Sequence, residues 1–238
     1  MKTHTHRVEC HPIKHRQQGI SLIELMIALV LGLLIVSAVF NVFVGSVTTA
    51  AYRDGVLAMQ QNGHFGIKTL KDGIQAAGFS RDFPIDPFDM DASNTNQLVV
   101  RLEAPQDCNG GDTTPMGGIA ENTYRFDAAN SRITCRGNSN GAQEMMLVSG
   151  VDQFRYLFGV DVDFDGFVDR YVRYTPTLNQ LTVLSVRVGI LVNSVTPIKK
   201  TASRKVFAIL DRAVRIRDKL SRQVFTGTIV LKNRYKPL

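Results

Sequence analysis

The chain has 238 residues, 44% of them hydrophobic, enough for one globular domain with a packed core plus accessory segments. Its net charge of +7 is uneven: residues 1–19 carry +3, residues 199–238 carry +10, and the residues between them carry −6. An acidic middle and a basic end attract each other within a chain, between subunits, or with nucleic acid. Beyond the first 19 residues His64 is the single histidine, which excludes His-based triads and multi-histidine metal sites from that part of the chain.

A long uncharged segment lies near the N-terminus. No charged residue occurs from Leu25 to Tyr52, and the first half of this segment is almost purely aliphatic. A helix of about 20 such residues crosses a hydrocarbon layer about 30 Å thick. Positive charge before the segment and mixed charge after it predict an N-terminus in the cytoplasm and a downstream domain outside it.

Three interpretations of this segment differ in how they treat Glu24, near the start of the apolar run. A secretory signal cleaved near the small residues 36–38 and an uncleaved signal anchor both leave this acid unexplained. A carboxylate inside a bilayer costs about 3 kcal/mol or more, so it is usually functional and paired. The third interpretation, a prepilin-type leader, gives the acid a role.

Residues 19–25, GISLIEL, resemble the cleavage region of type IV pilin precursors, which has a glycine, a cut, an apolar first residue and a glutamate at mature position five. The resemblance implies cleavage after Gly19 by a prepilin peptidase on the cytoplasmic side of the membrane and methylation of the new N-terminus, Ile20. The family most often has phenylalanine or methionine at this position, so Ile20 is a departure. Glu24 would neutralise the amino terminus of a neighbouring subunit, because two opposite charges left unpaired in lipid are costly.

The helical pattern continues past the apolar segment to about Ala77, although four glycines weaken it. Residues 59–79, which run from MQQNGHF to QAAGF, are similar to a region of the PilW-type minor pilins. Residues 225–234, FTGTIVLKNR, are similar to the strand in which chains of that family tend to end. The helix is therefore expected to have a membrane half and an amphipathic half that packs on a domain.

Strand-like runs with turn signals between them follow a Pro/Asp/Asn-rich loop at residues 80–96. The expected strands are 97–102, 123–126, 132–135, 145–148, 153–158, 167–174, 181–192 and 224–231. Several alternate apolar and polar residues, which is typical of an antiparallel sheet with one covered face. Residues 205–222 have apolar residues at helical spacing, but the PilW resemblance implies a strand there, and we favour strand, loop and strand.

We therefore predict an α+β fold of the type IV pilin kind, with a long N-terminal helix, membrane-spanning in its first half, packed on an antiparallel β-sheet. The expected organisation is a cleaved leader at 1–19, a transmembrane and assembly helix at 20–47, its amphipathic continuation at 48–79 and a periplasmic β-rich domain at 80–238.

The chain has three cysteines, and the odd number becomes an even pair if the leader is removed. Cys10 lies in the leader, whereas Cys108 and Cys135 lie in polar, turn-rich surroundings. This arithmetic favours an oxidising compartment outside the cytoplasm and predicts a disulfide between Cys108 and Cys135.

Residues 161–169, DVDFDGFVD, follow the first nine positions of a calcium-binding loop. The pattern predicts weak calcium binding with a set of ligands formed by Asp161, Asp163, Asp165, the Phe167 carbonyl and Asp169. Position twelve is a valine instead of the bidentate glutamate, so the loop is no complete EF-hand. The alternative is a plain hairpin turn, with residues 165–166 as its turn residues.

The resemblance implies a minor pilin that takes part in the initiation and assembly of type IV pili, near the pilus tip. Its partners would be other minor pilins, the major pilin, the inner-membrane assembly platform and the prepilin peptidase. It would reside in the inner membrane as a single-pass protein with its domain in the periplasm, and later in the pilus at the cell surface. The alternative is a minor pseudopilin of a type II secretion system, which shares the leader and the general plan.

A rival of another class is a membrane-anchored binding module or hydrolase, which would need a catalytic or ligand cluster that we do not find in the sequence. We therefore expect no catalysis, no small-molecule substrate and no required cofactor. The basic C-terminal segment could attract phosphates, but its aromatic residues are widely spaced and offer no stacking platform. We expect it to be a solvated face or a surface that meets the acidic middle of a neighbouring subunit.

Overall fold

The computed structural model describes residues 19–233. The leader predicted for residues 1–19, apart from Gly19, and Cys10 within it lie outside the described residues. Contacts divide the chain into two units, Met1–Thr49 and Ala50–Leu238. Helix α1 (Leu22–Gln75) begins in the first unit and ends in the second.

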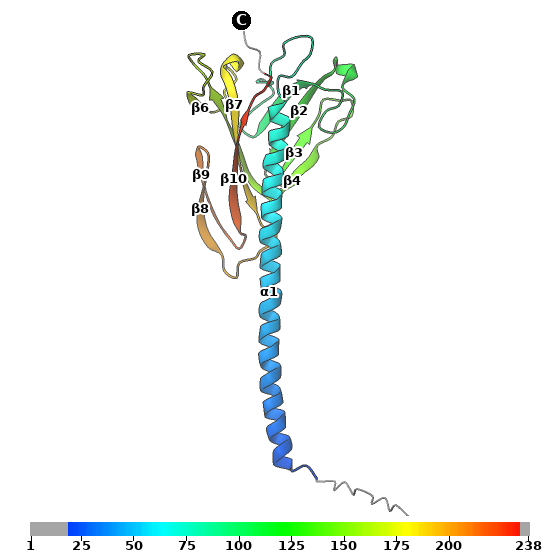
Figure 1. The fold of residues 1–238 in the computed structure, drawn as a ribbon, viewed down its shortest axis with the longest axis vertical. Coiled ribbons are helices and arrows are strands. Elements are labelled where there is room, and N and C mark those ends of the chain that lie inside the picture. Colours follow the sequence, from blue (N-terminus) through cyan, green and yellow to red (C-terminus); the bar gives the residue numbers. More distant parts are fainter. Residues whose placement is uncertain (1–18, 234–238) are drawn as a thin grey trace, which may run out of the picture. The chain divides into compact units, whose positions relative to one another are not determined.

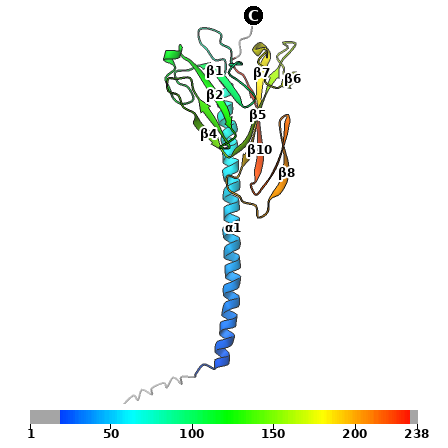
Figure 2. The same ribbon diagram turned by 180° about the vertical axis from the view of Figure 1, so that it is seen from behind.

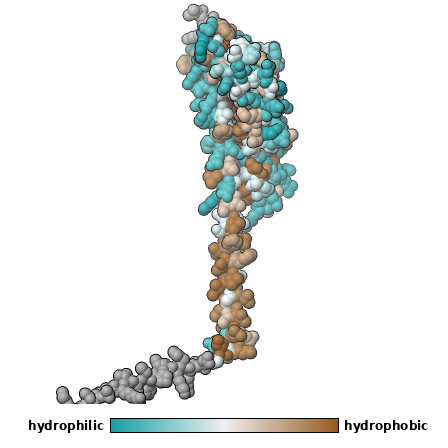
Figure 3. Space-filling model, turned by 90° about the vertical axis from the view of Figure 1, so that its right-hand side faces the viewer, coloured by the Kyte–Doolittle hydropathy of each residue, from teal (hydrophilic) through white to brown (hydrophobic). Residues whose placement is uncertain are grey.

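The described part of the first unit is helical from Leu22 onward, and all of its side chains are exposed. They are also almost uniformly apolar, as the brown surface on the face drawn in Figure 3 shows. By length and composition α1 is able to cross a membrane, as the uncharged run from Leu25 to Tyr52 predicts. An apolar surface of this extent is stable only against lipid or other protein.

The second unit contains antiparallel strands in three groups (Figures 1 and 2). The first sheet has the order β1-β2-β3-β4, formed by Gln97–Glu103, Ile119–Asp127, Arg132–Arg136 and Met145–Ser149. The second sheet has the order β10-β7-β5-β6, formed by Arg222–Val230, Val183–Asn193, Val151–Val160 and Arg170–Val172. Strands β8 (Ser203–Ile209) and β9 (Arg212–Asp218) form a two-stranded ribbon. Two short 3₁₀ helices, η1 (Thr114–Met116) and η2 (Gln180–Thr182), precede β2 and β7.

The fold is α+β as predicted, but the strands form two four-stranded sheets where a single one was expected. The chain passes from the first sheet to the second at Gly150, between the end of β4 and the start of β5. Gly150 has a φ of 70°, which glycine adopts at no steric cost. The Gly150 carbonyl accepts a hydrogen bond from Asn193 N–H (2.7 Å), so the turn is anchored to the end of β7.

The C-terminal half of α1 packs against both sheets through a stripe of small and apolar residues. The buried residues of α1 recur every three or four positions, and they are Gly55, Met59, Gly63, Gly66, Leu70 and Ile74. A Cβ atom added at Gly66 would lie 3.0 Å from Ile190 of β7 and 3.1 Å from Val148 of β4. One added at Gly63 would lie 2.2 Å from the Phe225 ring of β10. The glycines that weaken the helical pattern therefore allow α1 to approach the sheets closely.

Three other segments can be compared with what the sequence predicts. Residues 205–222 form strand, turn and strand, as favoured, because β8 and β9 pair along their whole length. The strand expected at residues 167–174 is reduced to β6, three residues long. The loop at residues 80–96 contributes to the core, because Phe88 is 1% exposed and packs edge-on against Phe158 at 5.2 Å between ring centroids.

Candidate functional sites: the N-terminal segment and an acidic loop

The residues of the predicted cleavage site lie before the first turn of α1. Gly19, Ile20 and Ser21 are not helical, and all three are exposed. Among the described residues, apart from Gly19 and its chain neighbours, no atom lies within 4 Å of the position that a Gly19 Cβ would occupy. The peptide bond after Gly19 therefore lies outside the helix and is not covered by the described part of the chain, as a peptidase requires of its substrate.

Glu24 lies in the first turn of α1 and is exposed. Its carboxylate is close to the positive end of the helix dipole, which favours an acid at this position. Ser21 and Glu24 also have the S-x-x-E spacing of a capping box, and Leu25 N–H donates to the Ser21 carbonyl (3.1 Å). Glu24 is therefore favourable at the start of the helix, and this local role is separate from the pairing role that the resemblance implies. The S-x-x-E spacing is a local signal that could have placed the start of the helix from the sequence, and the prediction above did not use it.

Residues 161–169 connect β5 to β6 as one long loop. The two strands pair up to Val160 and Arg170, so the connection is much longer than the two-residue turn of a tight hairpin. Gly166 has a φ of 92°, and Phe164, with a φ of 63°, also lies in the left-handed region that side chains rarely adopt. The loop therefore has a defined, locally strained path instead of a plain turn at residues 165–166.

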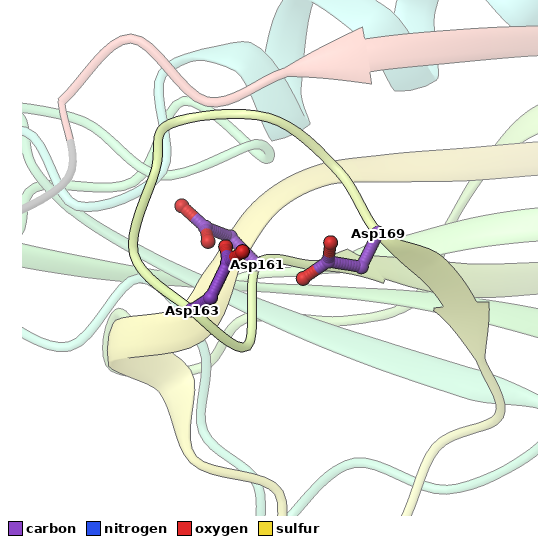
Figure 4. A group of neighbouring side chains, drawn as sticks. All are labelled: Asp161, Asp163 and Asp169. Atoms are coloured by element: carbon purple, nitrogen blue, oxygen red, sulfur yellow. The ribbon is translucent and has the colours of Figure 1, made fainter.

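Three of the four aspartates of this loop converge. One carboxylate oxygen from each of Asp161, Asp163 and Asp169 lies within 4.8 Å of the other two. Figure 4 shows that the three carboxylates point into the space that the loop encloses. Among residues 19–233 this is the one group of three or more His, Cys, Asp or Glu side chains found to converge in this way.

Backbone N–H groups of the loop hold these carboxylates in place. Gly166 N–H donates to Asp161 Oδ2 (2.9 Å), and Val162 N–H donates to Asp169 Oδ2 (2.6 Å). Asp165, which the sequence pattern also includes among the ligands, lies outside the converging group. Its Oδ1 instead accepts a hydrogen bond from Phe167 N–H (2.8 Å).

Asp161 is the buried member of the group. It is 2% exposed, and its Oδ1 has no hydrogen-bond partner among the described residues. Asp163 and Asp169 are exposed, so the group opens to solvent on one side. An oxygen that is charged, buried and unpaired is costly, and native structures rarely leave one without a ligand or water.

Cys108 and Cys135 form a disulfide in the structure, with their Cα atoms 6.4 Å apart. It ties the loop after β1 to β3, beside a second anchored aspartate, Asp107. Burial alone would raise the pKa of Asp107, but hydrogen bonds from Ser139, Asn109 and Gly111 outweigh it and hold this pKa below its usual value. This region is thus fixed by covalent and polar contacts together.

The acidic middle and the basic end of the chain meet within the second unit. Arg222, at the start of β10, pairs with Asp152 of β5 and, at 2.6 Å, with Asp218. Asp211, in the turn between β8 and β9, pairs with Arg155 and Arg173. Intrachain attraction was one of the three outcomes that the charge distribution allowed, and the pair of Arg222 with Asp152 is an instance of it. The pairs of Asp211 have the opposite sense, because they join an acid of the basic segment to two arginines of the acidic middle.

Many basic side chains of the C-terminal segment remain exposed on the β8–β9 ribbon. They include Arg204, Lys205, Arg212, Arg215 and Arg217. Phe225 is only 7% exposed because it packs beneath α1, which removes it as a stacking surface for bases. His64 is exposed on the helix, and its ring lies edge-on to Phe225 at 5.2 Å between centroids.

Comparisons with known proteins agree with both resemblances. The family model of the prokaryotic N-terminal methylation motif matches residues 14–40, which include Gly19, Ile20 and Glu24. The family model described as type IV pilus-assembly protein W matches residues 119–233, from the start of β2 to just past β10. No curated protein and no solved structure gives a significant match. The two family matches, together with the apolar helix and the antiparallel sheets, are consistent with a type IV pilin-like precursor of the PilW type.

Proposed function

We propose that this protein is a minor pilin that takes part in the initiation and assembly of type IV pili, near the pilus tip. The observation that carries the proposal is the position of Glu24. This acid lies inside the methylation motif, in the first turn of a helix whose first half is otherwise mostly apolar and is exposed. A helix of this kind, on a chain with a PilW-type domain, is suited to lateral packing against the same helix of other subunits.

Physical chemistry supports a pairing role for Glu24. After cleavage the amino group of Ile20 would lie four residues from Glu24, so each subunit would present one positive and one negative group at the start of its helix. Neither charge is stable alone in hydrocarbon, whereas a pair between neighbouring subunits neutralises both. Pairing therefore sets the height at which one helix docks beside the next.

The location and partners follow from the same reasoning. Positive charge before the apolar helix favours an orientation with the N-terminus in the cytoplasm and the second unit in the periplasm. We propose other minor pilins, the major pilin, the inner-membrane assembly platform and the prepilin peptidase as partners. PilW-type proteins act in assembly, and we propose a structural role without catalysis for this chain as well.

The test is the substitution Glu24→Ala in a strain that lacks the wild-type protein. We expect membrane insertion and cleavage to be retained, because removing a charge from the apolar run does not disturb either. Piliation, counted on cells by electron microscopy, should fall to the level of the deletion strain. Gly19→Glu provides the matched control, because it should leave the precursor uncleaved and about 2 kDa heavier on a gel.

Normal piliation by Glu24→Ala would contradict the pairing role, and cleavage of Gly19→Glu at the normal site would contradict the processing step. Loss of protein secretion with normal pili on the deletion strain would instead favour the minor pseudopilin of a type II secretion system.

A further inference from the structure

We propose that the loop at residues 161–169 is a calcium site in which the carboxylates of Asp161, Asp163 and Asp169 bind the ion. The site goes beyond the role in pilus assembly and does not depend on it. The chemistry of the donor atoms indicates which class of cation the loop binds. The three carboxylates differ from the donor set that the sequence pattern predicts, because Asp165 is not among them.

The geometry of the three oxygens fits one ion. Calcium binds oxygen ligands at about 2.3–2.6 Å, so two ligands of one ion lie at most about 5 Å apart. The three carboxylate oxygens lie within 4.8 Å of one another and point into the same space (Figure 4). A single ion at their centre would therefore contact all three with small adjustments of exposed side chains.

The second, independent observation concerns the environment of the Oδ1 atom of Asp161. This residue is 2% exposed, and the oxygen has no hydrogen-bond partner among residues 19–233. Its other oxygen, Oδ2, is engaged by Gly166 N–H, so the side chain cannot rotate toward solvent without losing that bond. A bound cation would compensate the buried charge that the loop otherwise leaves unpaired.

The chemical type of the donor atoms indicates which class of cation the site binds. All three side chains are carboxylates, which suit hard cations, and the group contains no thiolate or imidazole to favour zinc or copper. An open side, a glycine at position six of the loop and flexible exposed carboxylates suit calcium, which tolerates six to eight ligands. Magnesium requires a nearly ideal octahedron at about 2.0–2.1 Å and usually keeps several of its waters.

The loop occupies one end of the second sheet. It follows Val160, which pairs with Val183, whereas the opposite end of β5 pairs with Val192, two residues before Ser194. Ser194 lies beside Gly55 of α1, so the loop is at the end of the second unit remote from Gly55. Val162, Phe164 and Phe167 of the loop are more than half exposed, so a bound ion would fix a loop that presents apolar side chains.

The test is calorimetric titration of calcium chloride into the full mature chain in detergent micelles. With only part of the EF-hand ligand set, we expect a dissociation constant of about 0.1–1 mM. Calcium at about ten times this value should raise the Tm of the second unit by about 3–5 °C. Magnesium should bind about tenfold more weakly, because of its stricter geometry.

The matched variants are Asp163→Asn and Asp165→Asn. Both change the same charge in the same exposed loop, two residues apart, but only Asp163 belongs to the converging group. We expect Asp163→Asn to weaken calcium binding about tenfold or more, and Asp165→Asn to change it by less than about threefold. Asp161→Asn should abolish binding, and its circular dichroism spectrum would show whether the fold is kept.

Two results would overturn the proposal. One is the absence of both a heat of binding and a Tm shift in the unaltered chain at about 10 mM calcium, well above the range of extracellular modules. The other is an equal loss of affinity in Asp163→Asn and Asp165→Asn, because it would mean that the acidic loop attracts calcium by net charge alone.

Discussion

The two halves of helix α1 have the same secondary structure but opposite surroundings. In the first unit every described side chain is exposed, and most of the side chains are apolar, as the face drawn in Figure 3 shows. In the second unit one stripe, lined by glycines and aliphatic residues, is buried against two sheets. The comparison shows that the chain itself supplies the packing partner for the second half only, so the first half must obtain its partner from lipid or from other subunits.

The glycines of α1 also have different surroundings in the two halves of the helix. Gly32 and Gly45, in the first unit, have no atom of the described residues within 4 Å of a hypothetical Cβ apart from the neighbouring helix backbone, whereas Gly55, Gly63 and Gly66 face side chains of the second unit. The same residue type is thus sterically indifferent in one half of the helix and required in the other. We therefore predict that comparable substitutions have different effects on stability in the two units.

The largest effect is expected from the disulfide, which lies entirely in the second unit. Replacing both Cys108 and Cys135 by alanine removes a link that closes a sequence separation of 27 residues. We expect the free energy of unfolding of the second unit to fall by about 3–4 kcal/mol on the chain-entropy model. Thermal unfolding of the protein in micelles measures this loss, which corresponds to a decrease in Tm of about 10 °C.

The helix of the first unit should keep its circular dichroism signal in this variant, because its backbone hydrogen bonds are local to the helix and do not depend on the disulfide. Thiol labelling of the unreduced protein offers an independent check. Two reactive thiols, at residues 108 and 135, would mean that the disulfide does not form in the cell.

A smaller effect is expected at the glycine stripe. Gly63→Val forces the Phe225 ring out of its place, because even a Cβ atom would lie 2.2 Å from it. Overpacking of this kind should cost the second unit about 2 kcal/mol. Gly45→Val is the matched change in the first unit, and it should leave the Tm of the second unit unaltered. Equal Tm values for the two variants would show that α1 does not approach the sheets as closely as described.

Much of the fold follows from local patterns in the sequence. The apolar run specifies the first half of α1, and the strand-like runs between turn signals specify most strands within a few positions, β1 and β4 among them. The division into two sheets was not predictable in this way, because it depends on a positive φ at Gly150 and on the long-range pairing of β7 with β5 and β10. The glycines of α1 look unfavourable by helix propensity, and only their tertiary contacts explain them.

The two candidate sites also differ in how far the sequence alone predicts them. The cleavage motif is a local signal, so Gly19, Ile20 and Glu24 could be selected from the sequence, and the methylation-motif match covers them. The acidic loop was recognisable by its spacing, but spacing alone counted Asp165 as a ligand. The separation of Asp165 from the other three depends on the backbone path through Phe164 and Gly166.

The central claim is that this chain is a prepilin-type precursor, and mass spectrometry of the protein purified from its native membrane tests it most directly. We predict a mature chain that begins at Ile20 and carries a methyl group on its amino nitrogen. A chain that retains Met1, or one cut near Ala38 as a secretory signal would be, would contradict the account.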